Sequence, residues 1–373
     1  MVASLRLPIL SSAMLFVFRR FPSFVWILIA CTGCLACDPS GGDEPTTPEP
    51  QPEPDANFFN PVYQVGPDPW VFQEGDTYYV TYTTGRNITL IETEKMSGLR
   101  TADARARTVW SPPASGMNSS QIWAPEIHRI DGTWYVYYAA SDGNNDNHRM
   151  WVLANEDADP MSDNWEDRGE LELPDDKWAI DGSPVAIDGQ WYFAWSGWEG
   201  DTNVAQDIYI TRMTSPTEVT GERVRVLQPE ADWERNGTDP RVVEGPQFIA
   251  HDNSLFMFYS AGGCWTDGYS LGALQLAIGD DPLAADSWTR LEQNPLFVSN
   301  AAARAYGPGH NSFFTSPDGT ENWILYHANA QPGQGCGDER SMRMQLFTWS
   351  ADGLPVLGEP AALGQALPVP AGE

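Results

Sequence analysis

The sequence predicts an all-β fold, a five-bladed β-propeller, from a recurring motif, its spacing and its turn chemistry. In each copy a carboxylate, a small or flexible residue and a proline precede an apolar strand, a polar turn and an aromatic-rich strand. The motif occurs four times, and a fifth copy has a histidine instead; the marker residues are Asp68, Glu126, Asp181, Glu244 and His310. Short strands that repeat at intervals of roughly 60 residues, with little helical periodicity, are typical of propeller blades.

The strands of each unit can be assigned in order along the chain. Turns such as Asp131-Gly132 and Asp188-Gly189 favour tight hairpins between the first and second strands. The predicted second strands are residues 78–82, 134–138, 191–195, 255–259 and 323–327, and the predicted third strands are residues 150–153, 207–210, 274–277 and 344–347. Residues 347–360 are expected to complete the last blade, and Phe58 and Phe59 to contribute to closure.

The composition agrees with such a fold and excludes one class of partner. Aromatic residues make up 12% of the 373 residues, which suits both a propeller core and a cleft that stacks on sugar rings. The formal net charge is -30 at pH 7. So acidic a chain is not expected to bind the phosphate backbone of a nucleic acid, and its charge mainly favours solubility.

Residues 1–37 are predicted to be a targeting segment that is not part of the fold. Basic residues precede an apolar run, residues 21–30, that is too short to span a bilayer. The run leads into Leu28-Ile29-Ala30-Cys31, which resembles a bacterial lipoprotein signal, so Cys31 is the predicted lipidation site, with Cys34 and Cys37 as rivals. A cleaved secretory signal is the alternative. Both place the protein outside the cytoplasm, in contact with a membrane only through a lipid anchor.

The segment after the signal, residues 38–56, is rich in proline and acidic residues and offers almost nothing to bury. Such a composition predicts a disordered, extended linker. The catalytic domain is expected to comprise residues 57–373, which makes three parts in all.

Two cysteines remain in the predicted domain, Cys264 and Cys336. Both lie in glycine-rich loops between the second and third strands of consecutive units, so the loops should emerge side by side on one face. In an oxidising compartment this arrangement predicts a disulfide. Trp265, next to the first cysteine, is expected to shape the rim of the site.

The marker residues predict a shared site because the first strand of each propeller blade lines the central channel. Asp68, Asp181, Glu244 and His310 should therefore surround one pocket. Carboxylates in a confined site disfavour one another's ionisation, so one is kept protonated while another stays charged. Glycoside hydrolysis needs this division, an acid for the departing oxygen and a base that activates water.

The motifs, in their order along the chain, resemble glycoside hydrolase family 43, the five-bladed arabinofuranosidases, arabinanases and xylosidases. The resemblance covers roughly residues 57 to 360 and rests on these motifs: Gly66-Pro67-Asp68-Pro69-Trp70, Trp123-Ala124-Pro125-Glu126-Ile127-His128, Ala179-Ile180-Asp181-Gly182-Ser183-Pro184, Glu244-Gly245-Pro246, Tyr306-Gly307-Pro308-Gly309-His310-Asn311-Ser312 and Tyr326-His327-Ala328.

The resemblance implies an inverting mechanism with three carboxylates. Asp68 matches the general base, Glu244 the general acid, and Asp181 the carboxylate that tunes and orients the acid. Inversion requires the base and acid carboxyls to lie roughly 6.5 to 9.5 Å apart. Glu126 matches a position usually seen in the family that is not one of the three catalytic groups; we interpret it as a channel residue and group it with the substrate-binding residues.

The resemblance also implies roles for His310 and Arg343. The histidine matches one that coordinates a calcium or sodium ion at the channel centre in many relatives, and no organic cofactor is expected. The arginine matches one that approaches the acid from the fifth blade, and an arginine on an apolar strand is expected to have a carboxylate partner. Trp123, ahead of its motif proline, could stack on a sugar ring.

The predicted function is therefore release of arabinofuranosyl units from arabinan, arabinoxylan or their oligosaccharides by an exo-acting enzyme outside the cytoplasm. The residues of the motifs look most like those of the exo-acting α-L-arabinofuranosidases of the family. The alternatives are a β-xylosidase or endo-arabinanase of the same family, a propeller that binds plant polysaccharide without cleaving it, and a retaining fructan-active propeller.

Overall fold

The computed structural model describes residues 56–236 and 239–373, and this part of the chain is built almost entirely of β-strands. The predicted signal, the lipidation site at Cys31 and all but the last residue of the predicted linker lie outside the described residues. The four helices described are single 3₁₀ turns: η1 (Met96–Gly98), η2 (Asn145–Asn147), η3 (Trp233–Arg235) and η4 (Ala285–Ser287). None of the helices in these two ranges is long and apolar enough to cross a membrane.

The strands form consecutive antiparallel groups of four. The first two groups are β2 (Trp70–Glu74), β3 (Thr77–Thr81), β4 (Ile88–Thr93) and β5 (Arg105–Trp110), then β6 (Ser120–Ile130), β7 (Thr133–Ser141), β8 (Arg149–Asn155) and β9 (Glu166–Glu170). The next three are β10 (Ala179–Ile187), β11 (Gln190–Gly197), β12 (Ala205–Ser215) and β13 (Glu218–Leu227); β14 (Arg241–His251), β15 (Ser254–Ala261), β16 (Ser270–Ala277) and β17 (Thr289–Arg290); and β18 (Tyr306–Thr315), β19 (Asn322–Asn329), β20 (Ser341–Trp349) and β21 (Pro355–Val356).

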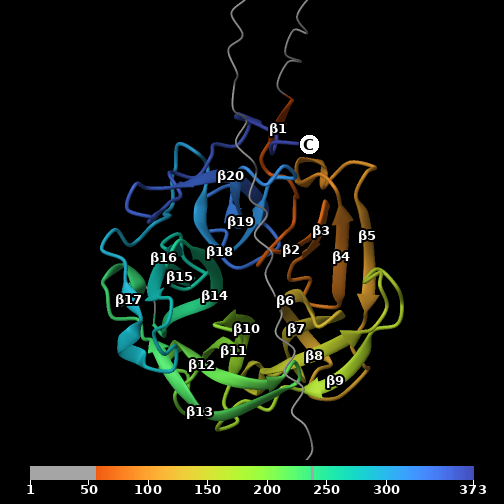
Figure 1. Ribbon diagram of the computed structural model, residues 1–373, viewed down its shortest axis with the longest axis vertical. Helices are drawn as coiled ribbons and strands as arrows, with labels where there is room; N and C mark the ends of the chain where they lie inside the picture. The colour runs from red at the N-terminus through yellow and green to blue at the C-terminus, as the bar shows by residue number, and fades with distance from the viewer. Residues whose placement is uncertain (1–55, 237–238) are drawn as a thin grey trace, which may run out of the picture. The chain divides into compact units, whose positions relative to one another are not determined.

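The groups follow one another around a centre, and the first strand of each group lies nearest to it (Figure 1). These first strands, β2, β6, β10, β14 and β18, each contact the first strand of the next group, and β18 contacts β2. The third and fourth groups are further joined where β12 and β14 pair in parallel at Ala205–Arg241 and Gln206–Val242. Residues far apart in sequence are thereby brought to one central channel.

The hairpin turns follow from their residues. Asp131 and Gly132 have φ values of 50° and 88°, and Asp188 and Gly189 have φ values of 49° and 77°. A two-residue hairpin of type I′ requires positive φ at both positions, which Asp tolerates and Gly adopts freely. The predicted second strands and the four predicted third strands lie within or largely within the observed strands, with β3 ending at Thr81.

The outer strands were the elements that the sequence pattern did not predict. The third strand of the first group, β4, had no predicted counterpart, nor did β5, β9, β13 and β17. Four of the five residues of β9 are charged and none is fully buried, so it lacks the alternation of apolar and polar residues that marks a half-buried strand. Its place at the edge of a sheet explains that polarity.

The two ends of the described domain are tied together. β1 (Asn57–Phe59) pairs antiparallel with β22 (Ala366–Pro368). Phe58 is buried against Trp323, with ring centroids 5.9 Å apart, whereas Phe59 is 51% exposed. The side chain of Asn60 donates to the carbonyl of Met344 at 2.8 Å and accepts its N–H at 3.0 Å. Phe58 therefore contributes to closure as expected, and Phe59 lies on the surface.

The core consists of apolar clusters that lie between neighbouring groups. Each of the five clusters combines side chains from two successive groups, with the last uniting the fifth group and the first. Trp134, for example, is fully buried on β7 and packs edge-on against Phe72 and Tyr79 of the preceding group. Burying such a ring contributes roughly 1.5–3 kcal/mol. This packing fixes the groups relative to one another and so fixes the central channel.

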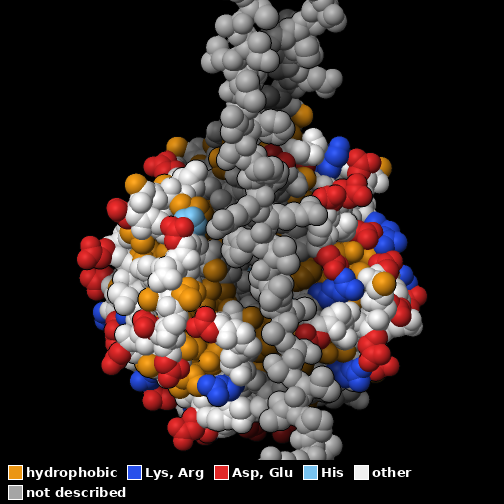
Figure 2. Space-filling view, in the orientation of Figure 1, with side chains coloured by type: hydrophobic (Ala, Val, Ile, Leu, Met, Phe, Trp, Pro, Cys, Tyr) orange, Lys and Arg blue, Asp and Glu red, His pale blue; other side chains and the backbone are white. Residues whose placement is uncertain are grey.

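Acidic side chains are spread over the visible face of the domain rather than gathered in one patch (Figure 2). Basic side chains occur among them in smaller numbers, as the net charge of -30 requires. Apolar side chains are visible near the middle of this face. The acidity is thus a general property of this surface.

Candidate active site

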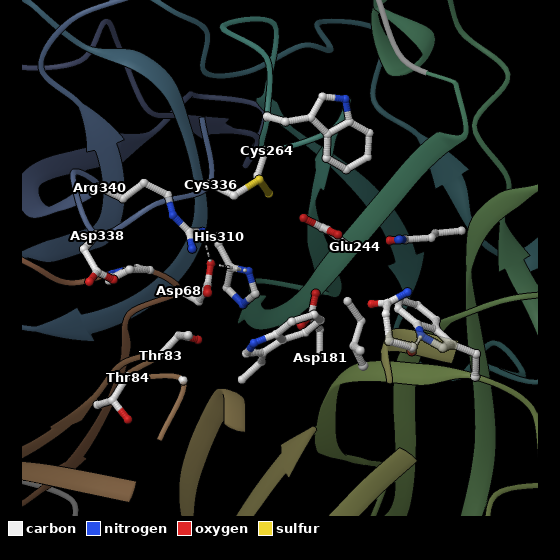
Figure 3. Close-up of a pocket in the computed structure, with 18 of the residues that line it drawn as sticks. Asp68, Thr83, Thr84, Asp181, Glu244, Cys264, His310, Cys336, Asp338 and Arg340 are labelled. Carbon is white, nitrogen blue, oxygen red and sulfur yellow. Dashed lines mark hydrogen bonds and ion pairs between the residues drawn. A yellow bond between two sulfur atoms is a disulfide. The ribbon is translucent and has the colours of Figure 1, made fainter. Parts of the chain in front are cut away.

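A cavity of about 460 Å³ is lined by residues from every group of strands. Figure 3 shows Asp68 beside Arg340 and His310, with Glu244 and Asp181 across the cavity from Arg340 and the Cys264–Cys336 bond near its edge. The lining residues are Pro67, Asp68, Thr83, Thr84, Gly85, Trp123, Asn145, Trp178, Ile180, Asp181, Asn203, Gln206, Pro240, Glu244, Cys264, Trp265, His310, Cys336, Asp338 and Arg340. The four predicted channel residues therefore do share one pocket.

The recurring motif marks irregularities in the strand pairing. The registers of β10 with β11, β14 with β15 and β18 with β19 shift at Ile180/Ser183, Glu244/Gln247 and Gly309/Ser312, respectively. Asp68, Asp181 and His310 have φ values of 53°, 55° and 45°. A bulge re-aims a side chain out of the ladder, and non-glycine residues at positive φ are concentrated at functional sites. The motif is thus the local geometry that turns a polar side chain toward the cavity.

Asp68 has a cationic environment. Nη1 of Arg340 lies 2.7 Å from its Oδ1, and Nδ1 of His310 lies 3.3 Å from the same oxygen. Its own N–H donates to Nδ1 of His327 at 3.0 Å. Burial opposes ionisation of this carboxyl, but the charge of Arg340 holds its pKa well below the usual value. Asp68 is therefore a carboxylate at neutral pH.

The surroundings of Glu244 raise its pKa, whereas those of Asp68 lower the pKa of that residue. Its side chain is buried, and its Oε1 accepts a hydrogen bond from the hydroxyl of Tyr269 at 2.8 Å. Burial raises the pKa of Glu244 to about 7, with a smaller upward contribution from the charge of Asp68, although the Tyr269 hydrogen bond and Arg340 act in the other direction. Glu244 can therefore hold a proton near neutral pH.

Asp181 is coupled to Glu244. Its Oδ2 accepts the N–H of Gly245 at 3.1 Å, which ties the two carboxylates through one peptide unit. Burial, followed by the charges of Glu244 and Asp68, raises the pKa of Asp181 well above its usual value. Two neighbouring buried carboxyls cannot both ionise readily, so this pair retains at least one proton near neutral pH.

The histidines are neutral, which leaves Arg340 as the cation beside Asp68. Burial lowers the pKa of His310 and, together with Arg340, lowers that of His327 further. Because Nδ1 of His327 accepts the N–H of Asp68, its proton lies on Nε2. The backbone N–H of His310 donates to Oγ of Ser260 at 2.8 Å. These bonds hold Asp68 and His310 in place.

The prediction that Arg343 binds substrate beside a carboxylate is wrong. Arg343 is fully buried and does not line the cavity; its guanidinium donates to the carbonyls of Arg304 and Asn329 at 2.9 and 3.1 Å. Backbone carbonyls, rather than an anion, compensate its burial. Arg340, three residues earlier, lines the cavity instead and pairs with Asp68, the predicted base, rather than with the acid. The signal for it was its position four residues after Cys336, in a loop already expected at the rim.

Glu126 lies beside the cavity rather than in it, which corrects its grouping with the substrate-binding residues. Its carboxyl accepts a hydrogen bond from the Gln247 side chain and lies 3.0 Å from Nε2 of His128. It is 2% exposed and lines a small adjoining void with Asp68 and His310. Its side chain is therefore part of the channel wall.

The predicted rim residues line the cavity. Trp123 stacks on His148 with ring centroids 4.0 Å apart, while Trp265 is 47% exposed. Cys264 and Cys336 form a disulfide between the two loops. Sequence reasoning missed Arg340, Tyr269 and the polar side chains of the third group, of which Gln206 is buried and lines the cavity.

The donor set around His310 does not form a metal cluster in the described part of the chain. Residues 56–236 and 239–373 contain no group of three His, Cys, Asp or Glu side chains that could hold a metal ion. Nδ1 of His310 faces Asp68, and the nearby cation is Arg340. The calcium or sodium ion expected at His310 stays a prediction.

An ionised carboxylate and a carboxyl that can hold a proton line a single cavity, which is the division that glycoside hydrolysis requires. The chain belongs to glycosyl hydrolase family 43, because the model of that family matches residues 58–355. This membership agrees with the resemblance that the motifs carried.

Three individual proteins of similar sequence or structure are named as arabinofuranosidases. An extracellular exo-alpha-(1->5)-L-arabinofuranosidase of Streptomyces avermitilis is 36% identical over 324 residues, covering 83% of this chain and 65% of the relative. One of the same name from Streptomyces chartreusis is 31% identical and covers 80% of this chain and 88% of the relative. The crystal structure of an alpha-L-arabinofuranosidase from Lactobacillus brevis superposes with a TM-score of 0.77 at 31% identity, covering 83% of this chain and 98% of that one. The chain thus spans slightly less than two thirds of the first relative.

Proposed function

We propose that this protein is an inverting glycosidase that removes terminal α-L-arabinofuranosyl units from arabinan, arabinoxylan or their oligosaccharides. The proposal rests on one observation: Asp68 and Glu244 line the same cavity, and their pKa values are shifted in opposite directions. The names of the Streptomyces relatives support the arabinofuranosyl unit and the exo mode of action.

In the proposed reaction, Asp68 accepts a proton from a water molecule that attacks the anomeric carbon. Glu244 donates its proton to the glycosidic oxygen as that bond breaks, so the leaving group departs as a neutral hydroxyl. Asp181 keeps a proton available in the acid pair and orients Glu244 through the Gly245 N–H. General acid and base assistance of this kind contributes about 10²–10⁴-fold each. The product is released with inverted anomeric configuration.

The surroundings of the site have proposed roles in binding. Trp123 and Trp265 line the cavity and offer aromatic surface to a sugar, while His310 is the proposed ion-contacting residue. The disulfide between Cys264 and Cys336 holds the loops that carry Trp265 and Arg340. The proposed catalytic residues are therefore Asp68, Asp181 and Glu244, with Arg340 supporting the base.

The five groups of strands are, in this proposal, the five blades of one propeller. The contacts of β2, β6, β10, β14 and β18 in a ring support it, as does the pairing of β1 with β22. Residues 57–373 form the catalytic domain, preceded by a signal (residues 1–37) and a linker (residues 38–56). The family match at residues 58–355 is consistent with the start of that domain.

The proposed location is outside the cytoplasm, with the domain tethered to the cell envelope through a lipid on Cys31. The word "extracellular" in the names of the Streptomyces relatives supports export, and Leu28-Ile29-Ala30-Cys31 supports the anchor. Expression of the full chain in a bacterial host tests it. The wild type should partition with detergent and Cys31→Ser should not; equal partitioning of the two proteins would contradict the anchor.

The experiment for the activity is incubation of the protein with arabinan, arabinoxylan and xylo-oligosaccharides, followed by analysis of the sugars released. Free arabinose as the first product from the chain ends is expected. Longer arabino-oligosaccharides would indicate an endo-arabinanase, and xylose would indicate a β-xylosidase. Binding without turnover, equal in the wild type and Glu244→Ala, would indicate a polysaccharide-binding propeller.

A further inference from the structure

Tyr269 is a buried tyrosine that contacts the surroundings of both Asp68 and Glu244. It lies just before β16, and its hydroxyl donates to Oε1 of Glu244 at 2.8 Å. Its ring lies parallel to that of His327, with an interplanar angle of 7° and centroids 5.7 Å apart. His327 in turn accepts the N–H of Asp68. One side chain thus connects the surroundings of the proposed acid with those of the base.

The ring of Tyr269 occupies a space that a glycine leaves open. A Cβ atom built on Gly309 would lie 2.3 Å from Cε1 of Tyr269 and 3.1 Å from Oγ of Ser260. Contacts as short as the first do not occur between real atoms, so the glycine is needed for the ring to sit where it does. Gly309 immediately precedes His310, so the motif that places the histidine also seats the tyrosine.

The hydroxyl of Tyr269 is a permanent donor. Burial, followed by the charges of Glu244 and Asp68, raises the pKa of Tyr269 well above its usual value, so the phenol stays protonated at neutral pH. A protonated carboxyl carries its hydrogen on one oxygen and accepts at the other. Because Tyr269 donates to Oε1, the proton of Glu244 belongs on Oε2. Among the described residues no hydrogen bond reaches Oε2, and Glu244 lines the cavity.

We propose that Tyr269 is a positioning residue that fixes the carboxyl of Glu244 and confines its acidic proton to Oε2, the oxygen that approaches the glycosidic oxygen. This inference rests on the proposed role of Glu244 as general acid. No bond to Tyr269 forms or breaks: the proton moves from Oε2 to the leaving oxygen, and Tyr269 then donates to the carboxylate that remains. The stronger hydrogen bond to the charged form lowers the cost of giving up the proton.

Tyr269→Phe separates this role from a structural one because removing the hydroxyl changes an ionisation. The hydrogen bond favours the ionised form of Glu244, so its loss raises the pKa of Glu244. We expect the alkaline limb of the kcat/KM profile to move up by about one pH unit. We also expect about a tenfold loss on arabinobiose, whose leaving group needs protonation, and a smaller loss on an aryl arabinofuranoside with an acidic phenol.

Tyr326→Phe is the matched control. Tyr326 is also fully buried, and its hydroxyl lies 3.2 Å from Oε1 of Gln345, outside the cavity. It should change neither the alkaline limb nor the ratio of the two substrates. A second probe, 3-fluorotyrosine at position 269, keeps the shape of the ring and strengthens the donor, so the alkaline limb should move to lower pH.

An unshifted alkaline limb in both position-269 variants, with equal losses on both substrates at every pH, would overturn the role of Tyr269 while leaving the proposed activity intact. A wild-type protein inactive on every arabinofuranoside would overturn the proposed function and this inference together. The wild-type profile is therefore recorded first.

Discussion

The two carboxyls proposed for catalysis line the same cavity, and they differ chiefly in which groups surround them. Asp68 lies 2.7 Å from a guanidinium and beside two neutral histidines, so its burial is outweighed. Glu244 is buried beside a phenol and a second carboxyl, with no cation bonded to it in the described residues. Burial alone therefore does not set the charge of an acid in a closed site. The partner supplied by the fifth group of strands decides it.

The largest expected effect on activity comes from replacing either of these two carboxyls with an amide. Asp68→Asn and Glu244→Gln should each lower kcat/KM on arabinobiose by about a thousandfold. They should differ on an aryl arabinofuranoside with an acidic phenol, where Glu244→Gln recovers much of the lost activity and Asp68→Asn does not. Steady-state kinetics on the two substrates measure this difference.

The control for these substitutions is Asp131→Asn. Asp131 lies in an exposed turn at a φ of 50°, which Asn tolerates equally, so activity should be unchanged. Equal recovery of both active-site variants on the activated substrate would contradict the assignment of base and acid.

The next effect concerns stability, because the raised pKa of Glu244 links protonation to folding. A carboxyl whose folded pKa lies above its unfolded value of 4.5 stabilises the fold fully below that value and loses this contribution as pH rises through about 7. Between pH 4.5 and 8 the wild type should therefore lose about 3 kcal/mol more unfolding free energy than Glu244→Gln. Urea unfolding at several pH values measures it. Equal pH dependences of the unfolding free energy in the two proteins would show that the pKa of Glu244 is not raised.

A smaller effect is expected from removing the cation beside Asp68. Arg340→Met leaves burial as the dominant influence, so the pKa of Asp68 rises and the acidic limb of kcat/KM moves up by roughly two pH units. Arg343→Met is the matched control, because Arg343 contacts backbone carbonyls instead of a carboxylate. It should lower Tm and leave the acidic limb in place. An acidic limb that moves only in the control would reverse the roles of the two arginines.

The contrast also shows what the sequence could and could not predict. The three carboxylates were predictable because each belongs to the recurring motif, and at Asp181 and Glu244 that motif coincides with a shift in strand register. Arg340 was missed in favour of Arg343 because a strand pattern shows that an arginine is enclosed without showing whether carbonyls or a carboxylate enclose it. Tyr269 was missed because a single aromatic residue in a loop carries no periodicity. The space that Gly309 leaves for its ring forms only when the fourth and fifth groups pack together.

The outer strands were missed for a related reason. β9 and β5 are largely exposed, so their residues record contact with water rather than with a core. The second strand of each group is almost wholly buried and was predictable from apolar and aromatic runs. The sequence therefore predicts best the part of the fold that builds the cavity.

The central claim is that Asp68 is charged while Glu244 holds a proton, and ¹³C NMR of the labelled side-chain carboxyls tests it most directly. The wild type should show a Glu244 carboxyl that titrates near pH 7 and is absent in Glu244→Gln, and an Asp68 carboxyl that is still ionised at about pH 3, where an ordinary Asp is mostly protonated. Both carboxyls titrating together near pH 4, as in exposed side chains, would contradict the account.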